Sequence, residues 1–414
     1  MSSSTPRRTR LSALALAALA VAATVGVVVT GPAHAASPAD TPASAHVVRA
    51  PLDAKALREA ITIRPGDQAA GAVAWVHKSG HEWSGASGDV HTGKRISDTA
   101  HFRIGSISKT FEAVVLLQLS AEGRVDLDGT VQHYLPGLLP ETFQPITVRQ
   151  LLNHTSGLPS DFEGAPARTG DEQIATRFDY YTFDRVIQGT LRPEGRAWPG
   201  PHFAPGTRQE YNSFGYRVAG KLIEQLTGHS LKHEITDRVL TPLRMRHTSV
   251  PAGNTAVPRP YLPGYLPTSK GELVDVNEQG GNPSQMISTT ADLDRFMTAL
   301  FTGRLLRPAQ SAELRALPRD ADGKLLPYAN GSNCNIGRDK GSACFSVALM
   351  SFPLPDGTLL WGKTGHDYGY ASGVFASPDL SRRAVYAVGT DSFGDGAAPR
   401  ISGRLAAAAF GSDG

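Results

Sequence analysis

The sequence predicts an α+β fold, in which an antiparallel sheet is flanked by terminal helices and a mostly helical region is inserted between its strands. Near the N-terminus, an amphipathic run at 54–61 precedes two short apolar stretches, 71–77 and 81–85. Lys78-Ser79-Gly80 joins these stretches, as expected of a β-hairpin. Near the C-terminus, four apolar segments of strand length precede an Ala-rich helical segment at about 400–410; the four are 345–352, 358–361, 372–376 and 384–389.

Helical patterns dominate the middle of the chain, at about 110–317. The strongest predicts a helix over 106–122, because its apolar residues form a broad face and Gly123 is placed as a C-terminal stop. Further helices are expected at 218–226 and 291–300. No internal repeat and no clear linker divides residues 52–414, so the sequence predicts one folded unit with two subregions.

Composition excludes two broad classes of protein. The chain has 414 residues, of which 40% are hydrophobic and 19% charged, so it is too apolar for a disordered protein. Lys plus Arg number 41 and Asp plus Glu 38, which gives a net charge of +3. Because no concentrated basic excess is present, we expect a small-molecule partner and no nucleic acid.

The N-terminus has the pattern of an export signal. A basic region ending at Arg10 is followed by an apolar stretch at 11–29 and then by Ala33-His34-Ala35, with small residues where a signal peptidase needs them. We expect a signal peptide at 1–35, cleaved near Ala35, and a flexible tether at 36–51. An uncleaved membrane anchor is the alternative, and the export route stays open. No later stretch is long enough to span a bilayer, so we expect a secreted, extracellular protein with no membrane contact after cleavage.

Cys334 and Cys344 are the two cysteines of the chain. In an oxidising compartment this pair favours one disulfide that closes a local loop rich in Gly and Asn. A metal site is disfavoured because no histidines or further cysteines cluster there.

Ser106-Ile107-Ser108-Lys109 is a Ser-x-x-Lys motif at the start of the strongest predicted helix. Helix positions i and i+3 share one side, so Lys109 can reach the hydroxyl of Ser106. A serine hydroxyl is a weak nucleophile until a neighbouring base removes its proton. A surface Ser and Lys on a helix would produce the same letters, so the motif needs support from elsewhere in the chain.

Two further segments supply that support. Tyr211 is expected to expose its phenol at a junction between a loop and a helix, where a nearby ammonium would favour loss of its proton. Lys363-Thr364-Gly365 follows the predicted strand that ends at Trp361. Its cation and hydroxyl can hold a carboxylate, and Gly365 lets a substrate backbone approach closely.

Together these segments resemble the penicillin-recognising serine hydrolases, which include D-alanyl-D-alanine carboxypeptidases, class C β-lactamases and related esterases. The resemblance covers nearly all of 52–414 and is carried also by segments 102–106, 114–119, 134–140, 146–158 and 227–230. It implies a β-lactamase/transpeptidase-like fold and is greatest to a soluble, exported D-alanyl-D-alanine carboxypeptidase. It also implies that Ser106 forms an acyl-enzyme, with Lys109 and Tyr211 moving protons.

The same resemblance assigns the remaining site residues. It implies substrate contacts from Ser213, Lys363, Thr364 and Gly365, and an oxyanion hole from the backbone N–H groups of Ser106 and His366. Two positions depart from the family pattern. Asn212 and Ser213 stand in swapped order, so a shorter hydroxyl replaces the usual amide. Lys363 stands where the carboxypeptidase relatives have His and β-lactamases have Lys.

We therefore expect a secreted serine D-alanyl-D-alanine carboxypeptidase that β-lactams acylate, acting as a monomer on peptides that end in D-Ala-D-Ala and needing no metal or organic cofactor. A β-lactamase or an esterase on the same scaffold is the alternative, and a non-catalytic module that binds β-lactam or peptidoglycan is a third. Whether Lys109 or Tyr211 acts as the first base stays open. His154 is interpreted as a structural hydrogen-bonding residue, and 88–95 as a hairpin turn.

Overall fold

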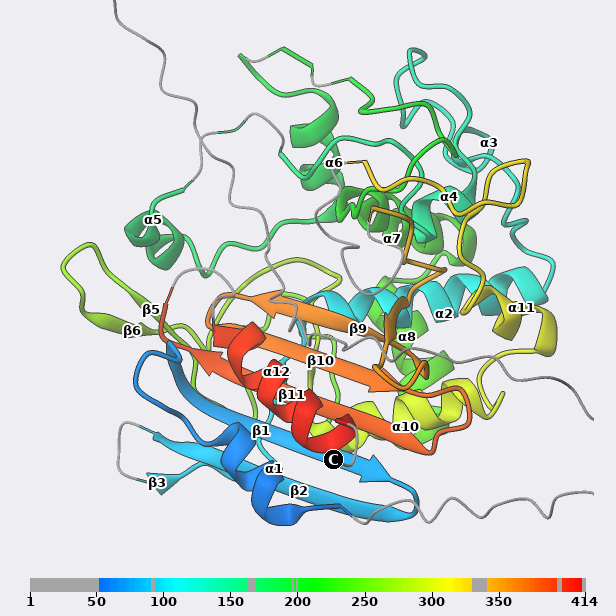
Figure 1. The fold of residues 1–414 in the computed structure, drawn as a ribbon. Helices are drawn as coiled ribbons and strands as arrows, with labels where there is room; N and C mark the ends of the chain where they lie inside the picture. Colours follow the sequence, from blue (N-terminus) through cyan, green and yellow to red (C-terminus); the bar gives the residue numbers. More distant parts are fainter. Residues whose placement is uncertain are drawn as a thin grey trace, which may run out of the picture.

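The structure, a computed structural model, describes residues 52–411 except 91–93, 163–164, 166–167, 196, 199, 330–340 and 393–396. Its central feature, within these residues, is a seven-stranded sheet with strand order β3-β2-β1-β11-β10-β9-β8 (Figure 1). The strands are β1 (Ala69–Lys78), β2 (His81–Val90), β3 (Lys94–Arg95), β8 (Met350–Pro353), β9 (Leu359–Asp367), β10 (Tyr370–Ala376) and β11 (Arg382–Thr390). Every neighbouring pair is antiparallel.

The first long strand lies beside the last. β1 pairs along almost its whole length with β11, from Ala72 opposite Val388 to Lys78 opposite Arg382, and β1 pairs with β2 on its other edge. The hairpin at the N-terminus and the strands at the C-terminus therefore join into one sheet, as the sequence predicts.

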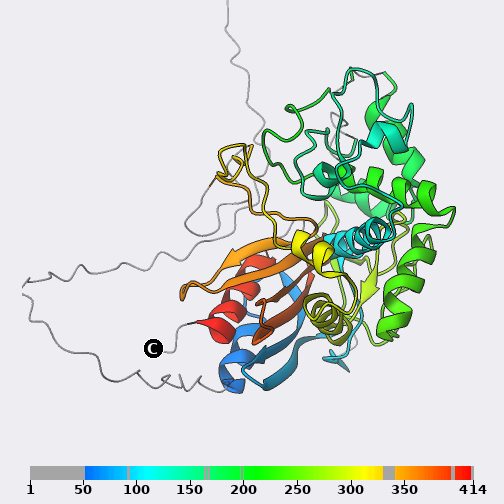
Figure 2. The ribbon, with the colours of Figure 1, turned by 90° about the vertical axis from the view of Figure 1, so that its right-hand side faces the viewer.

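Helices cover both faces of this sheet. The terminal helices α1 (Ala54–Ile61) and α12 (Ala397–Phe410) pack on one face, and α10 (Thr290–Phe301) packs on the other (Figure 2). Alternate strand residues point to opposite faces, so each face receives its own apolar layer. The layer under the terminal helices includes Leu57, Ala74 and Leu405, and the larger core on the α10 side includes Val73, Phe111 and Phe296.

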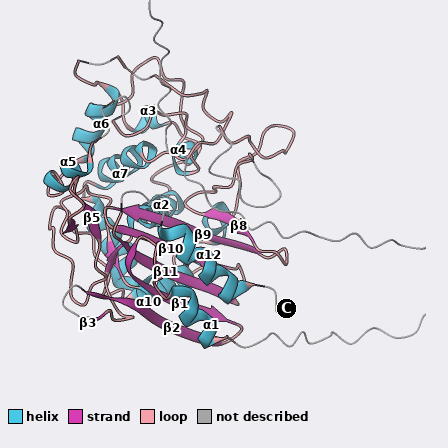
Figure 3. Cartoon of the chain, turned by 60° about the vertical axis from the view of Figure 1, so that its left-hand side comes forward, coloured by secondary structure: helices cyan, strands magenta, loops and turns pink. Residues whose placement is uncertain are grey.

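A mostly helical region lies on the side of the sheet that ends in β9 and β8 (Figure 3). It includes α2 (Ser108–Ala121), preceded by a 3₁₀ turn, η1 (Gly105–Ile107), and α7 (Phe214–Thr227). The shorter helices are α3 (Val131–Tyr134), α4 (Val148–Leu152), α5 (Gly170–Ala175), α6 (Phe183–Leu191), α8 (Leu231–Ile235), the π-helical η2 (Thr236–Leu240), α9 (Thr241–Leu243) and α11 (Pro308–Glu313). Two small antiparallel sheets pair β4 (Phe102–Arg103) with β7 (Ile287–Ser288) and β5 (Tyr265–Pro267) with β6 (Leu273–Asp275).

The structure confirms the α+β fold and the terminal helices, and it corrects two local predictions. The strand expected over 345–352 is wrong for its first half. Ser346 and Leu349 instead close a turn, and Ala348 has φ +76°, which a strand cannot contain. The segment that begins at Leu359 runs on to Asp367, so Lys363-Thr364-Gly365 lies inside a strand and not after its end.

Several expectations fall outside the described residues. The signal peptide at 1–35, the tether at 36–51 and Cys334 are among them. Cys344 is buried, and its pairing with Cys334 stays a prediction. In the described part of the chain, no helix combines the length and the apolar character that crossing a bilayer requires.

Candidate active site

Ser106 and Lys109 meet at the start of the buried helix α2. Ser106 lies in the 3₁₀ turn η1 and is half-buried, whereas Lys109 is only 4% exposed. Lys109 Nζ lies 3.0 Å from Ser106 Oγ, within hydrogen-bond distance. The i, i+3 contact predicted from the spacing is therefore present, and it places an amine beside a candidate nucleophile.

Tyr211 reaches the same place from the loop before α7. The sequence predicts an exposed phenol, but the Tyr211 hydroxyl is buried. The phenol ring lies near two ammonium groups, at 5.6 Å from Lys109 Nζ and 4.6 Å from Lys363 Nζ, measured to the ring centroid. Burial alone would raise the pKa of Tyr211, but Lys109 and Lys363 outweigh it and lower that pKa to about 7. A phenol in this state can accept a proton near neutral pH.

Lys363 comes from the interior of β9. Its side chain is 3% exposed, and Nζ donates to the backbone carbonyl of Thr364 at 2.9 Å. Burial lowers the pKa of Lys363, while the nearby Tyr211 phenol acts in the opposite direction. The ammonium group of Lys363 lies against the Tyr211 ring, where its positive charge favours the phenolate. Thr364, the next residue, is half-buried.

One edge of β9 is left open for the nucleophile. β8 pairs only with Leu359–Gly362, and the 3₁₀ turn η1 packs against β9 in the part beyond. Two glycines allow this close approach. A Cβ on Gly365 would lie 1.9 Å from the carbonyl oxygen of Ile104, and one on Gly105 would lie 2.5 Å from the backbone nitrogen of His366.

This approach places the backbone of His366 directly against the residue that precedes Ser106. The two N–H groups that the family resemblance assigns to an oxyanion hole thus belong to segments in backbone contact. Gly105 has φ +49°, so the turn uses the left-handed region that glycine adopts readily.

Asn212 and Ser213 have different environments. The Asn212 amide is buried; it donates to the carbonyls of Leu158 and Pro159 and accepts from the N–H of Gly215. Asn212 therefore fixes the start of α7, and its polar atoms are already used. Ser213 is half-buried and makes no capping hydrogen bond, which leaves it as the candidate substrate contact of the pair.

Two residues hold Tyr211 in place, and sequence reasoning connected neither of them with it. His154, with φ +62°, packs against the Tyr211 ring at 4.6 Å, and its Nδ1 accepts from the N–H of Asn212. Burial, reinforced by the charges of Lys363 and Lys109, keeps the pKa of His154 well below its usual value. It is a neutral structural residue, as interpreted from the sequence. The Tyr328 hydroxyl accepts from the N–H of Tyr211 at 2.7 Å, a contact between distant segments that no local pattern signals.

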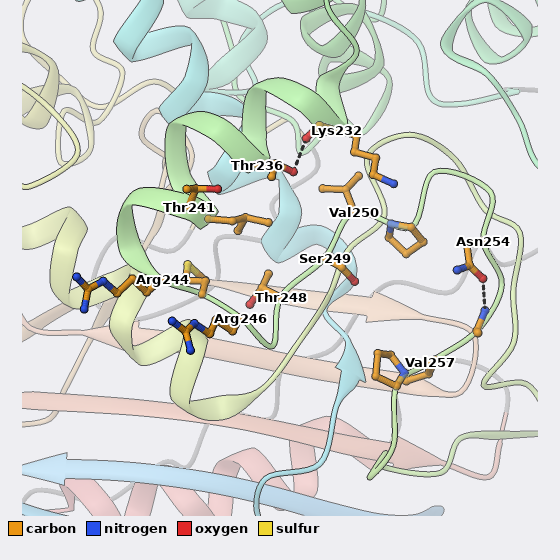
Figure 4. Close-up of a pocket in the computed structure, with 15 residues that line it drawn as sticks. Lys232, Thr236, Thr241, Arg244, Arg246, Thr248, Ser249, Val250, Asn254 and Val257 are labelled. Atoms are coloured by element: carbon orange, nitrogen blue, oxygen red, sulfur yellow. Dashed lines mark hydrogen bonds between the residues drawn. The ribbon is translucent and has the colours of Figure 1, made fainter.

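Two other features lie away from Ser106. A cavity of about 720 Å³ is lined by residues of α8, η2, α9 and the loop that follows, including Lys232, Thr241 and Val257 (Figure 4). Among the described residues, His229, His233 and Glu234 form a group that could hold a metal ion. The carboxylate of Glu234 is, however, already paired with His229 and Arg238.

Comparison with known proteins gives a family match over most of the chain. The family described as Beta-lactamase matches residues 57–409. Among curated relatives, penicillin-binding protein 4 of Amycolatopsis lactamdurans is 32% identical over 168 residues, which are 39% of this chain and 40% of that protein. Protein flp of Staphylococcus aureus strain MW2 is 32% identical over 164 residues, 39% of this chain and 30% of that protein. The matched segments thus span well under half of these relatives.

Solved structures match over more of the chain. A D-stereospecific amidohydrolase from Streptomyces sp. superposes with a TM-score of 0.72 and 29% identity, covering 86% of this chain and 98% of that one. The D-amino acid amidase of Ochrobactrum anthropi SV3 superposes with a TM-score of 0.66 and 22% identity, covering 85% and 97%, and at this identity it supports the fold alone.

Proposed function

The chain belongs to the Beta-lactamase family of penicillin-recognising serine hydrolases, and from this premise we propose that it hydrolyses amide bonds through an acyl-enzyme on Ser106. One observation carries the proposal. Lys109 Nζ lies 3.0 Å from Ser106 Oγ, and the phenol ring of Tyr211 lies 5.6 Å from Lys109 Nζ and 4.6 Å from Lys363 Nζ. These groups can take up and return the serine proton.

The proposed reaction has two halves. The base, Lys109 or Tyr211, takes the proton of the Ser106 hydroxyl while Oγ bonds to the substrate carbonyl carbon. The backbone N–H groups of Ser106 and His366 stabilise the oxyanion, a contribution of about 2.7–4 kcal/mol for each donor. The C–N bond then breaks, and the leaving nitrogen receives the proton held by the base. Water cleaves the ester in the second half, giving up a proton to the same base and restoring Ser106.

The substrate we propose is a peptide or amide in which a D-amino acid supplies the carbonyl. The likeness to a D-stereospecific amidohydrolase at 29% identity supports this choice. A D-alanyl-D-alanine carboxypeptidase is one such enzyme, because D-Ala supplies the scissile carbonyl and a second D-Ala leaves. Thr364, beside the open edge of β9, is the proposed contact for the carboxylate of that leaving residue, and Ser213 for the acyl side.

A β-lactam would acylate the same serine, and the likeness to penicillin-binding protein 4 favours this reaction as well. A penicilloyl group that stays on Ser106 would indicate a carboxypeptidase, whereas rapid release would indicate a β-lactamase. We also propose that the protein acts outside the cell, as a monomer, after removal of residues 1–35.

The test is intact-mass analysis after incubation with benzylpenicillin. We expect a covalent adduct that maps to Ser106 and is absent from Ser106→Ala. Ser120→Ala makes the same change farther along α2 and should leave the adduct unchanged. If wild-type protein forms no adduct and releases no product from any substrate below, the acyl-enzyme proposal is wrong.

A substrate panel then separates the candidate activities. It compares release of D-alanine from diacetyl-Lys-D-Ala-D-Ala, hydrolysis of D- and L-phenylalanine amides, turnover of nitrocefin and hydrolysis of short acyl esters. We expect cleavage of the peptide or of the D-amide, with the L-amide at least tenfold slower. Activity on esters alone would support the esterase, and fast nitrocefin turnover the β-lactamase.

A further inference from the structure

Glu112 is a buried carboxyl group close to the candidate catalytic residues that the reaction above does not use. It lies on α2 and is 0% exposed. Glu112 follows Lys109 by three residues on this helix, so the two side chains are neighbours on its surface. Helical side chains lean toward the N-terminus of their helix, which directs Glu112 back toward Lys109.

The surroundings of Glu112 are unusual for a carboxyl group inside a protein. Both carboxylate oxygens are buried and, among the described residues, neither has a hydrogen bond of good geometry. Ser284 lies close enough to interact with the carboxyl group, yet its own buried hydroxyl likewise has no such bond in the described part of the chain. A buried carboxylate normally accepts hydrogen bonds from several donors. Within the described ranges Glu112 lacks these donors, so its burial at this place needs an explanation other than hydrogen bonding.

The charged groups that face Glu112 come from two helices. Lys109 lies one turn earlier on α2, and Arg217 lies on α7, where it also pairs with Asp161 and donates to Asn282. Tyr216, also on α7, feels the carboxylate, but burial keeps its phenol protonated, with a pKa well above the usual value. Burial raises the pKa of Glu112 to about 7, against the opposing pull of Arg217 and Lys109.

We propose that Glu112 is a positioning residue: its buried carboxyl group, one helical turn after Lys109, sets the charge around the Ser106–Lys109 pair. When the carboxyl group is ionised, its negative charge offsets the positive charge of Lys109. When it is protonated, that offset is absent. The charge that Ser106 and Tyr211 experience therefore depends on Glu112, which itself touches no substrate. This inference rests on the proposed function only for its effect on the reaction, because the coupling between the two side chains exists without substrate.

The coupling is tested first, by a double-mutant cycle in thermal stability that needs no activity. Glu112→Gln keeps the shape of the side chain and removes its charge, and Lys109→Met removes the ammonium. We expect Glu112→Gln to raise Tm at pH 8, where the carboxyl group is ionised, and to have much less effect at pH 5. The gain at pH 8 should be larger in the Lys109→Met background, since the lost ammonium no longer compensates the carboxylate. Additive effects at pH 8 would overturn the inference.

The effect on the reaction is tested by the pH dependence of acylation by benzylpenicillin. We expect Glu112→Gln to move the acidic limb of the profile to lower pH by about one unit and to make it sharper. The direction follows because removal of a neighbouring anion favours loss of a proton from the group that acts as the base. Glu122→Gln, an identical change at the far end of α2, is the matched control and should leave the profile in place.

The outcomes separate the two proposals. If wild-type protein forms no adduct and releases no product from the substrate panel, the proposed function fails, and the stability cycle alone decides the inference. If it is acylated and the Glu112→Gln profile superimposes on that of wild type, the inference fails while the proposed function stands. Glu112→Met removes the same charge without the amide. It should reproduce both shifts, and it serves if Glu112→Gln does not fold.

Discussion

Two ammonium groups face one phenol in this site, and that arrangement decides where protons reside. Lys109 is held by the helix that carries Ser106, whereas Lys363 arrives on β9 from a distant part of the chain. The spacing of a helix is local, so the Ser106–Lys109 contact could be predicted from four residues. The position of Tyr211, by contrast, depends on its contacts with His154 and Tyr328, which only tertiary packing brings together.

The phenol of Tyr211 should make acylation depend on pH near neutrality. With a pKa of about 7, the phenol loses its proton as pH rises through this value, so the base becomes available above pH 7 and is lost below it. We expect Tyr211→Phe to lower the acylation rate by about 10²–10⁴-fold and to remove this limb.

The measurement is the second-order rate constant for adduct formation between pH 5 and 9. Tyr134→Phe removes a phenol whose hydroxyl accepts from the N–H of Asp126, and it should keep the wild-type profile. An unchanged rate in Tyr211→Phe would exclude this residue from proton transfer.

At the scale of elements, β9 and the 3₁₀ turn η1 form the site by packing backbone against backbone. Gly105 and Gly365 allow this packing because neither has a Cβ. Both glycines are visible in the sequence, but the backbone atoms that a Cβ would contact belong to the opposite element, so the sequence does not predict the contact. The same limit explains why the first half of the strand predicted at 345–352 is wrong. Its apolar residues are typical of a strand. The N–H groups of Cys344 and Phe345, however, donate to the side-chain oxygen of Gln209, and the chain turns at Ala348. Periodicity reports burial and cannot report such a partner.

Gly105→Ala should therefore damage both fold and chemistry. The new Cβ would lie 2.4–2.7 Å from backbone atoms of His366, which cannot rotate away, and φ +49° disfavours a residue with a side chain. We expect a loss of more than about 2 kcal/mol in the free energy of unfolding, with acylation reduced at least tenfold.

Denaturant unfolding and adduct formation check this prediction. Gly403→Ala is the control, since Gly403 lies in helix α12 with nothing within 4 Å of the added Cβ. It should gain about 0.5–1 kcal/mol. Wild-type stability and acylation in Gly105→Ala would show that the two backbones are farther apart than described.

Across the whole molecule, the two ends of the described chain stabilise the sheet together. Arg404 on α12 donates to both carboxylate oxygens of Asp67, at 2.8 and 2.9 Å, and to the carbonyls of Ala60 and Thr62 at the end of α1. The terminal helices were predicted from their apolar patterns, but this link joins the two ends of the sequence and carries no local signal.

Asp67→Asn should destabilise the protein at neutral pH by about 2 kcal/mol, because a buried hydrogen-bonded ion pair loses its charge. The hydrogen bond from Arg404, opposed by burial, holds the pKa of Asp67 below its ordinary value of 3.8. The ion pair therefore contributes above about pH 4, and its contribution disappears as pH falls through the lowered pKa.

Urea unfolding of wild type and Asp67→Asn at pH 7 and pH 3 measures this effect. The difference in the free energy of unfolding should shrink at the lower pH. Asp322→Asn, in an exposed turn, should match wild type at both values. A difference that is equal at both pH values would mean that the Asp67 charge contributes nothing.

β1 pairs with β11, and α1 packs against α12, so the first and last elements of the described chain are in contact. A circular permutant could join Phe410 to Leu52 through a short linker and begin instead at the exposed Asp356-Gly357 turn between β8 and β9. In such a protein every strand would keep its neighbours in the sheet, but β9, with Lys363, would be the first strand to be synthesised. The order in which the gene encodes the site is thus independent of the order in which the sheet arranges it.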